Sequence, residues 1–311
     1  MSENRFQLPS RVKPLIFDHV SPSYSIWIKR DDEIHPDISG NKYRKLVPNI
    51  DHVKSKGFKG IITFGGAFSN HIHAVAASGE FFGIPTVGII RGESESIQNP
   101  TLQFALAKGM KIHFVTRTEY KDKDDAPSIA NIIASYSQYF LIPEGGSNEL
   151  GISGAATLLD EILEQGHCPD AIFLAAGSGA SAAGLLRRIH ELNLPIQLYV
   201  IPVLKGEFMD QTILDLAGIT SGTRLSVMHD FHQGGYGKVT AELIRFINEF
   251  YESHQIPLDP IYNGKAMFAL LQIVKNNQIP QPSNIVYIHT GGLQGIEGYR
   301  FRKSGPAINF R

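Results

Sequence analysis

The feature that most constrains the fold is a regular alternation of short β-rich runs with segments of helical period. Runs such as GIITFG (60–65), TVGII (86–90) and AIFLAA (171–176) are each followed by a segment with apolar residues three or four positions apart. Strands that alternate with helices form βα units around parallel sheet. The alternation pauses at the loop EGGSNELG (144–151) and then restarts. The pattern therefore predicts an α/β fold with two lobes.

The same reading places the individual elements. The predicted strands are 23–30, 60–65, 86–90, 111–116, 139–143, 171–176, 198–203 and 284–290. Within 40–57 a loop leads into the first predicted helix. The other predicted helices lie near 69–82, 98–108, 126–137, 153–165, 181–192, 207–217, 237–253 and 264–276, with one more after 290. The charge run EYKDKDD (119–125) is typical of a solvated loop.

Composition and charge exclude several classes of protein. The chain has 311 residues, of which 42% are hydrophobic and 19% charged, which is typical of a globular protein. Its net charge of -1 provides no basic field for a nucleic-acid partner. No apolar run approaches the roughly 20 residues that span a bilayer, and the first residues lack the apolar core of a signal peptide. We therefore expect a cytoplasmic protein without a membrane or nucleic-acid partner.

Cysteine and histidine offer little for metal binding. Cys168 is the single cysteine, so an internal disulfide and a Cys-rich metal site are excluded, and a buried apolar role is expected for it. His71 and His73 form an H-x-H pair, but on a helix these side chains would diverge. We predict no metal site.

Four junctions between strands and helices are rich in Gly, Ser and Asn. They are GGAFSNH (65–71), EGGSNELG (144–151), AGSGASAAG (176–184) and HTGGLQG (289–295). Each alone is compatible with a tight turn. In open α/β sheets, however, ligands bind at the carboxyl ends of strands, where helix N-termini present free N–H groups to anions. Together the four loops predict one ligand-binding cleft.

The loop 176–184 is the best candidate for a phosphate site, because it links an apolar strand to a helix with small residues. Gly177, Gly179 and Ala182 also fit G-x-G-x-x-A, but the next strand lacks the acidic residue that a dinucleotide needs. A dinucleotide-dependent oxidoreductase therefore stays a weaker alternative. QGGYGKVT lacks the glycine and hydroxyl positions of a nucleotide-hydrolase loop, and GGAFSN lacks the G-x-S-x-G of a hydrolase elbow.

Lys42 follows Gly40 and Asn41 on a predicted loop before a helix, where position alone suggests a surface lysine. Its surroundings, however, belong to an ordered series of motifs. The series reads KRDD, SGNKYRKL, GGAFSNH, IPEGGSN, GSGASAAG, GGYGK, YNGKAM and HTGG. In these motifs the chain resembles the 1-aminocyclopropane-1-carboxylate (ACC) deaminase and D-cysteine desulfhydrase family of pyridoxal 5'-phosphate (PLP) enzymes. The resemblance extends from about residue 30 to residue 292.

The resemblance implies a fold, a cofactor and roles for individual residues. The fold would be that of the tryptophan synthase β-subunit (PLP fold type II), with residues 1–44 and 153–311 in a large domain and 45–152 in a small one. Lys42 would carry the cofactor as a Schiff base. The phosphate would be bound by Gly177, Ser178, Gly179, Ala180 and Ser181, with Lys45 nearby. Asn70 would bind the cofactor ring oxygen and Thr290 the pyridine nitrogen. The substrate would meet Ser69, Asn70, His71, Tyr236 and Tyr262, and a homodimer is implied.

Two residues bear on the choice of reaction. A hydroxyl such as that of Thr290 cannot fix a full proton on the pyridine nitrogen, so the ring is a weaker electron sink and favours β-elimination. Family members that open the cyclopropane ring resemble Tyr-Glu-Gly-Lys at this place, whereas this chain has Asn263 after Tyr262. An amide lacks the proton chemistry of a carboxylate. The Asn-Gly pair also fits a simple turn before a helix. We therefore predict a D-cysteine desulfhydrase-like enzyme that acts on a small amino acid.

Some alternatives stay open at this point. The first is ACC deaminase activity, and the second is a protein that binds PLP or an amino acid without catalysis. Asp31, Asp32 and His35 precede the lysine motif and could close the site, although a solvated turn is the simpler interpretation.

Overall fold

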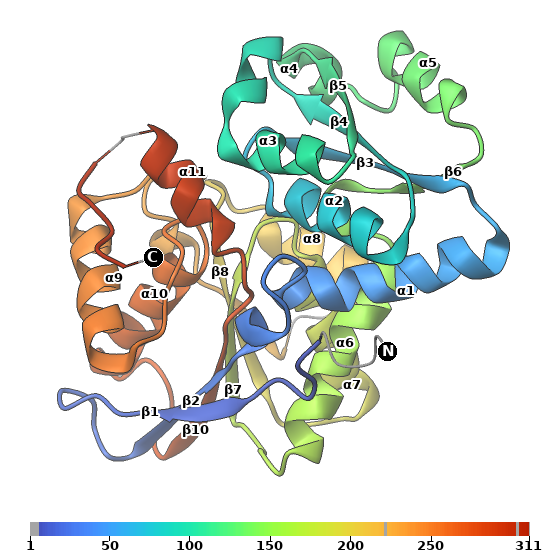
Figure 1. The fold of residues 1–311 in the computed structure, drawn as a ribbon. Helices are drawn as coiled ribbons and strands as arrows, with labels where there is room; N and C mark the ends of the chain where they lie inside the picture. Colours follow the sequence, from blue (N-terminus) through green and yellow to red (C-terminus); the bar gives the residue numbers. More distant parts are fainter. Residues whose placement is uncertain (1–5, 221–222, 303–304, 311) are drawn as a thin grey trace.

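The structure is a computed structural model that describes residues 6–220, 223–302 and 305–310, and its strands form two separate sheets (Figure 1). The larger sheet has the order β1 (Val12–Leu15), β2 (Tyr24–Lys29), β10 (Ser283–Ile288), β7 (Ala171–Ala176), β8 (Gln197–Pro202) and β9 (Leu225–Val227). The smaller has the order β5 (Lys111–Val115), β4 (Thr86–Arg91), β3 (Gly60–Gly66) and β6 (Tyr139–Ile142). All neighbours are parallel except β1 and β2. The predicted α/β class is confirmed.

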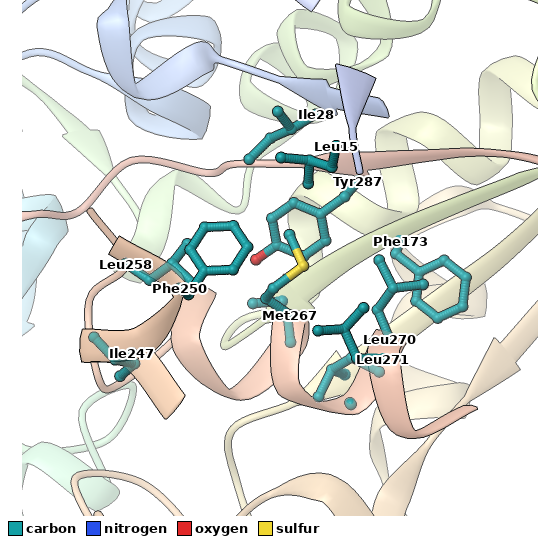
Figure 2. Close-up of a cluster of buried hydrophobic side chains, with 14 of the residues drawn as sticks. Leu15, Ile28, Phe173, Ile247, Phe250, Leu258, Met267, Leu270, Leu271 and Tyr287 are labelled. Carbon is teal, nitrogen blue, oxygen red and sulfur yellow. The ribbon is translucent and has the colours of Figure 1, made fainter. Parts of the chain in front are cut away.

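The central strands of the larger sheet are buried on both faces, because helices cover each side. One face packs on α6 (Glu149–Glu164), α7 (Ala180–Glu191) and α8 (Met209–Ala217), and the other on α9 (Ala241–His254) and α10 (Asn263–Lys275). Figure 2 shows the core on the side of α9 and α10, in which Tyr287 of β10 lies near Leu15 of β1, Ile28 of β2 and Met267 of α10. This packing fixes the start of α10, because the Tyr287 hydroxyl donates to the backbone oxygen of Asn263 at 2.9 Å.

The smaller sheet is likewise covered on both faces. The helices α1 (Gly40–Lys56), α2 (Asn70–Phe82) and α3 (Pro100–Ala107) share one core with it, and α4 (Arg117–Lys121) and α5 (Pro127–Ser135) lie on the opposite face (Figure 1). Helix α1 also packs closely on α6 of the larger sheet, where a Cβ on Gly154 would lie 2.1 Å from the backbone oxygen of Arg44. Helix α1 therefore joins the two halves of the molecule.

Several elements differ from the predictions. Strands β1 and β9 are short and carry no clear alternation, and they were not predicted. The first part of 119–125 belongs to α4, which a capping box at Thr116 stabilises, so the prediction of a continuous loop was wrong there. Cys168 is exposed, not buried. The boundary predicted between residues 44 and 45 falls inside α1, and the division into domains stays a proposal.

The remaining helices complete the description. Short 3-10 helices lie at Asp31–Glu33, Ser94–Gln98, Glu144–Gly146 and His229–Phe231, and α11 (Gln294–Arg302) ends the ordered elements. Within the residues described, none of the helices combines the length and apolar character needed to span a bilayer. The described part of the chain also holds no cluster of three or more His, Cys, Asp or Glu side chains suited to a metal ion.

Candidate active site

A cavity of about 390 Å³ lies at the carboxyl ends of β3 and β7, where the starts of α1, α2 and α7 meet. Of the predicted site residues, it is lined by Lys42, Lys45, Ser69, Asn70, His71, Gly177, Ser178, Gly179, Ser181, Tyr236, Tyr262 and Thr290. Ala180 is buried in the first turn of α7 and does not line the cavity. The structure thus brings together segments that are far apart in the sequence.

Lys42 occupies the first turn of α1, so the prediction that it lies on a loop before the helix was wrong. Gly40 sets its position, because a Cβ there would lie only 1.9 Å from the backbone oxygen of Thr290. The Asn41 N–H also donates to that oxygen at 3.2 Å. Burial lowers the pKa of the Lys42 amine to about 8, although the Asp259 carboxylate opposes the shift. The amine therefore loses its proton far more readily than an ordinary lysine.

Lys45 lies three residues further along α1 and is buried, whereas Lys42 is half-buried at the cavity. Its Nζ donates to the backbone oxygen of Gly145, and the described residues place no carboxylate within ion-pair distance of it. Burial, together with the nearby Lys42 charge, holds its pKa well below the usual value. A buried ammonium that has only carbonyl partners would be stabilised by an anion in the cavity.

The junction between β7 and α7 has the geometry of an anion cradle. Gly179 is the N-cap of α7 with φ 82°, in the left-handed region that favours glycine, and it has no side chain to cap the first N–H groups of the helix. These groups lie beside the cavity that Ser178 and Ser181 also line. A Cβ on Gly177 would lie 3.1 Å from the Tyr262 ring, so the small residue also admits that ring. The loop therefore suits a single phosphate group.

The start of α2 presents polar groups to the same cavity. Ser69 is its N-cap and accepts from the N–H groups of His71 at 3.2 Å and Ile72 at 3.3 Å. Its hydroxyl proton remains available to a ligand. Asn70 approaches so closely that a Cβ on Gly292 would lie 2.3 Å from its Nδ2. The helix start is thus suited to a second anionic group.

His71 is buried and neutral. Burial and the charges of Lys42 and Lys45 hold its pKa well below the ordinary value. The Thr63 hydroxyl donates to Ile142 O at 2.7 Å, so it must accept from His71 Nε2, which lies 2.9 Å away. His71 Nδ1 is consequently an acceptor, and it has no partner within the described part of the chain.

A buried network lies behind the site and changes the interpretation of Asn263. This residue begins α10 and is fully buried, so the simple turn considered above does not describe it. Its Oδ1 accepts from Thr290 N at 2.9 Å, and its Nδ2 donates to Asp259 Oδ2 at 2.7 Å. Asp259 also accepts from the N–H groups of Ile261 and Tyr262. The sequence analysis missed Asp259, although an acidic residue shortly before a helix is a recognised start signal.

Comparison with known proteins identifies the chemistry of this arrangement. The model of the pyridoxal-phosphate dependent enzyme family matches residues 14–291, which is most of the chain. The chain belongs to this family. Its cofactor is therefore pyridoxal 5'-phosphate, and the predicted enzyme class is confirmed. The Lys42 amine of lowered pKa, the anion cradle at the start of α7 and the Thr290 hydroxyl fit that cofactor, since its aldehyde, phosphate and pyridine nitrogen would each have a suitable partner in the cavity.

The most similar relatives narrow the type of PLP enzyme. The chain is 31% identical to a Pyrococcus horikoshii protein provisionally named an ACC deaminase, over 88% of this chain and 86% of that protein. It is 30% identical to a bifunctional D-cysteine desulfhydrase/ACC deaminase of Arabidopsis thaliana, over 87% of this chain and 73% of that protein. A crystal structure of an ACC deaminase homologue superposes with TM-score 0.81 at 27% identity, covering 96% of this chain and 94% of that one. The chain is a PLP enzyme of the ACC deaminase/D-cysteine desulfhydrase type, and the predicted fold type II is confirmed.

The acidic residues before Lys42 are a further correction. Asp31 and Asp32 are buried at 0% and 8% exposure, so they do not form a solvated turn. Asp31 pairs with Arg44 at 2.6 Å, and Asp32 pairs with Arg30 at 2.7 Å. In this PLP enzyme they stabilise the chain that leads into α1, whose first turn carries Lys42.

Proposed function

We propose that this PLP enzyme catalyses β-elimination from a small amino acid, with D-cysteine desulfhydrase-like activity that yields a keto acid and ammonia. The observation that carries the proposal is the amide of Asn263, which is buried against Thr290. Family members that open the cyclopropane ring resemble Tyr-Glu-Gly-Lys here, with a glutamate at this position. Lys42 carries the cofactor. Its amine, with a pKa lowered to about 8, accepts the Cα proton of the substrate.

The other residues of the cavity bind and orient. Lys45 and the loop from Gly177 to Ser181 hold the cofactor phosphate, while Asn70 contacts the ring oxygen. The Ser69 hydroxyl donates to the substrate carboxylate at the start of α2, and the neutral His71 ring lies beside it. Tyr262, whose pKa burial raises well above the usual value, and the more exposed Tyr236 stay protonated and donate hydrogen bonds to the substrate. When bound, PLP supplies an electron-withdrawing ring that stabilises negative charge at Cα.

The surroundings of Asn263 support elimination over ring opening. Thr290 Oγ1 lies 3.3 Å from Asn263 Oδ1, a long contact that leaves the hydroxyl able to turn toward the ring nitrogen. A glutamate at position 263 would place a second carboxylate beside Asp259, whose Oδ2 is 2.7 Å from Asn263 Nδ2. Two buried like charges at that distance are strongly unfavourable. The site is therefore built around a neutral amide and a weak electron sink, which favour substrates with a good leaving group.

The test is keto-acid release across D- and L-cysteine, β-chloro-D-alanine and ACC. We expect turnover of D-cysteine and β-chloro-D-alanine and little or none of ACC. Turnover of ACC that equals or exceeds that of D-cysteine would restore the deaminase interpretation. The variant Asn263→Glu should lose stability without gaining ACC turnover unless Asp259 is also neutralised.

The attachment site is tested separately. The purified enzyme should absorb in the visible, and borohydride reduction followed by peptide mapping should place the pyridoxyl label on Lys42. Lys42→Ala should lose the covalent link, with a fall in activity of about 10³-fold or more. A label on Lys45 or Lys265 would contradict the assignment. The homodimer and the cytoplasmic location remain predictions, of which light scattering tests the first.

A further inference from the structure

A second cavity of about 730 Å³ adjoins the first and is lined by a cluster of cations. The two cavities share five lining residues, namely Gly66, Asn70, Arg91, Tyr236 and Tyr262. They therefore adjoin at the wall that the proposed substrate would touch. The second cavity lies outward of this wall, between α4 of the small sheet and α11.

Four of its side chains carry positive charge and one carries negative charge. Arg91 ends β4, Arg117 and Lys121 lie on α4, and Arg302 ends α11, while Glu93 is the acidic residue. All four cations are exposed. Across the described ranges, none of the four has a carboxylate within ion-pair distance. The chain as a whole has a net charge of -1, so positive charge is concentrated at this cavity.

Aromatic rings and small residues position two of these guanidinium groups. Arg302 lies over the Phe68 ring at 5.1 Å, and Arg91 lies over the Tyr120 ring at 5.4 Å. A Cβ on Gly66 would lie 3.5 Å from Arg91 Nη2, so this group covers the strand end that leads to Ser69. Arg302 Nε donates to Gly298 O at 3.4 Å, and the terminal N–H groups of both guanidinium groups can bind an anion.

We propose that the second cavity binds an anionic β-substituent of the substrate, so that the preferred amino acid carries a phosphate on its side chain. This inference rests on the proposed elimination and narrows its substrate class. The amino-acid head lies in the first cavity, and the side chain passes the shared wall to Arg91 and Arg302. Glu144 lines the first cavity, where its carboxylate is compatible with the ammonium group of the substrate. Glu93 lines the second cavity, where the four cations outnumber it.

With O-phosphoserine the reaction balances without an added oxidant or reductant. The Cα–H bond breaks and its proton goes to the Lys42 amine. The Cβ–O bond then breaks, and its electron pair leaves with the phosphate group, whose charge the guanidinium groups stabilise. Water finally releases ammonia, so that the products are pyruvate, ammonium and inorganic phosphate.

The test compares O-phosphoserine with β-chloroalanine, each as both enantiomers, on the holoenzyme. We expect the ratio of kcat/KM for the phosphate over the chloride substrate to fall about three- to tenfold in Arg91→Gln/Arg302→Gln. The ratio should also fall as ionic strength rises, because the cluster is exposed. Arg245→Gln, an exposed arginine on α9 that lines neither cavity, is the matched control and should leave the ratio unchanged. The visible absorbance band reports that each variant is folded and loaded.

The outcomes separate the two proposals. Turnover of β-chloroalanine without turnover of either enantiomer of O-phosphoserine would overturn this inference and leave the elimination intact. An unchanged ratio in the folded double variant would also overturn it. If neither compound reacts while the absorbance band is present, the elimination itself fails, and this inference fails with it.

Discussion

The two sides of helix α1 treat buried cations in opposite ways. Arg44 faces α6 and pairs with the carboxylates of Asp31 and Glu161, while Lys29 joins the same cluster through Glu161. Lys42 and Lys45, within one turn of Arg44, face the cavity instead. Among the residues that the structure describes, their Nζ atoms donate only to neutral oxygens, those of Asn41 and Gly145. Helix α1 therefore separates a cluster of ion pairs from a cavity whose lysines have lowered pKa values.

The pKa values follow this division. Burial raises the pKa of Glu161, yet hydrogen bonds and charge from Arg44 and Lys29 outweigh burial and hold it at about 2. The carboxylates of Asp31 and Glu161 likewise outweigh burial and raise the pKa of Arg44. Burial lowers the pKa of Lys42 to about 8, and burial together with the Lys42 charge holds that of Lys45 well below its usual value. Paired charges stay ionised and hold the fold, whereas unpaired amines approach the neutral form that PLP chemistry requires.

The largest expected effect on stability follows from removing the Glu161 carboxylate from the charged cluster. Glu161→Ala leaves buried Lys29 without its carboxylate partner and removes one of the two carboxylates that pair with Arg44, which should lower the free energy of unfolding by about 3–5 kcal/mol. Urea denaturation measures this. The control is Glu149→Ala, which removes the ion pair to Arg187 at a site where Glu149 is 69% exposed, and it should cost no more than about 1 kcal/mol. Equal losses in the two variants would remove the distinction between the two kinds of pair.

The same carboxylate predicts acid sensitivity. Its pKa falls from 4.5 to about 2 on folding, so its contribution is complete above pH 4.5 and disappears as the pH falls toward 2. A shift of this size corresponds to roughly 3 kcal/mol. Urea titrations at several pH values should show this loss in the wild type and a smaller one in Glu161→Gln. A profile that is the same in both proteins would contradict the assignment.

Lys265 tests whether every lysine near the cavity serves chemistry. It is fully buried, and its Nζ donates to the backbone oxygens of His232 at 3.0 Å and Gly235 at 2.8 Å, next to Tyr236. Lys265→Met would leave these oxygens unsatisfied, and we expect a loss of about 1–3 kcal/mol in stability. The KM should rise as well, because the segment that carries Tyr236 is released. A variant with wild-type stability and KM would show that this anchor is dispensable.

Lys45→Met should separate function from stability. The apoprotein should keep its free energy of unfolding within about 1 kcal/mol, because a poorly paired buried amine is replaced by an apolar chain of similar size. The affinity for PLP should fall about tenfold, which corresponds to about 1.4 kcal/mol. Arg44→Met is the matched control and should show the reverse, a large loss of stability with little direct effect on PLP affinity. Equilibrium dialysis and urea denaturation provide the two measurements.

The smallest effect is kinetic and concerns Lys42. Its folded pKa of about 8 lies below the ordinary value of 10.5, so burial of the charge opposes folding fully below pH 8, and this cost disappears as the pH rises to 10.5. The apoprotein should consequently capture PLP faster as the pH rises through about 8, where the amine becomes neutral. Stopped-flow absorbance after mixing with PLP measures the rate. A rate that is flat across this range would contradict the lowered pKa.

Much of the architecture was predictable because it depends on local patterns. Apolar runs such as 171–176 and 284–290 give strands, and the glycine-rich loops after them give helix starts at an edge of the sheet. The short strands β1 and β9 could not be predicted, since three or four residues carry too little periodicity. The first turn of α1 was misassigned as a loop because Gly40 is a poor helix former, and only its contact with Thr290 explains the helix start there.

The sequence by itself determined the class of enzyme, since the ordered motifs around Lys42, Ser69 and Gly179 and the alternation of strands and helices are properties of the chain. Only the tertiary structure decided which side chains are charged partners and which are free. Asp31 and Asp32 looked like a solvated turn, yet they are buried against arginines, one of which lies on another element. Asp259 and Asn263 likewise acquire their relation to Thr290 only when α10 packs beside β10. The physical reason is that burial and ion pairing depend on residues distant in sequence, whose separations exist only in the folded molecule.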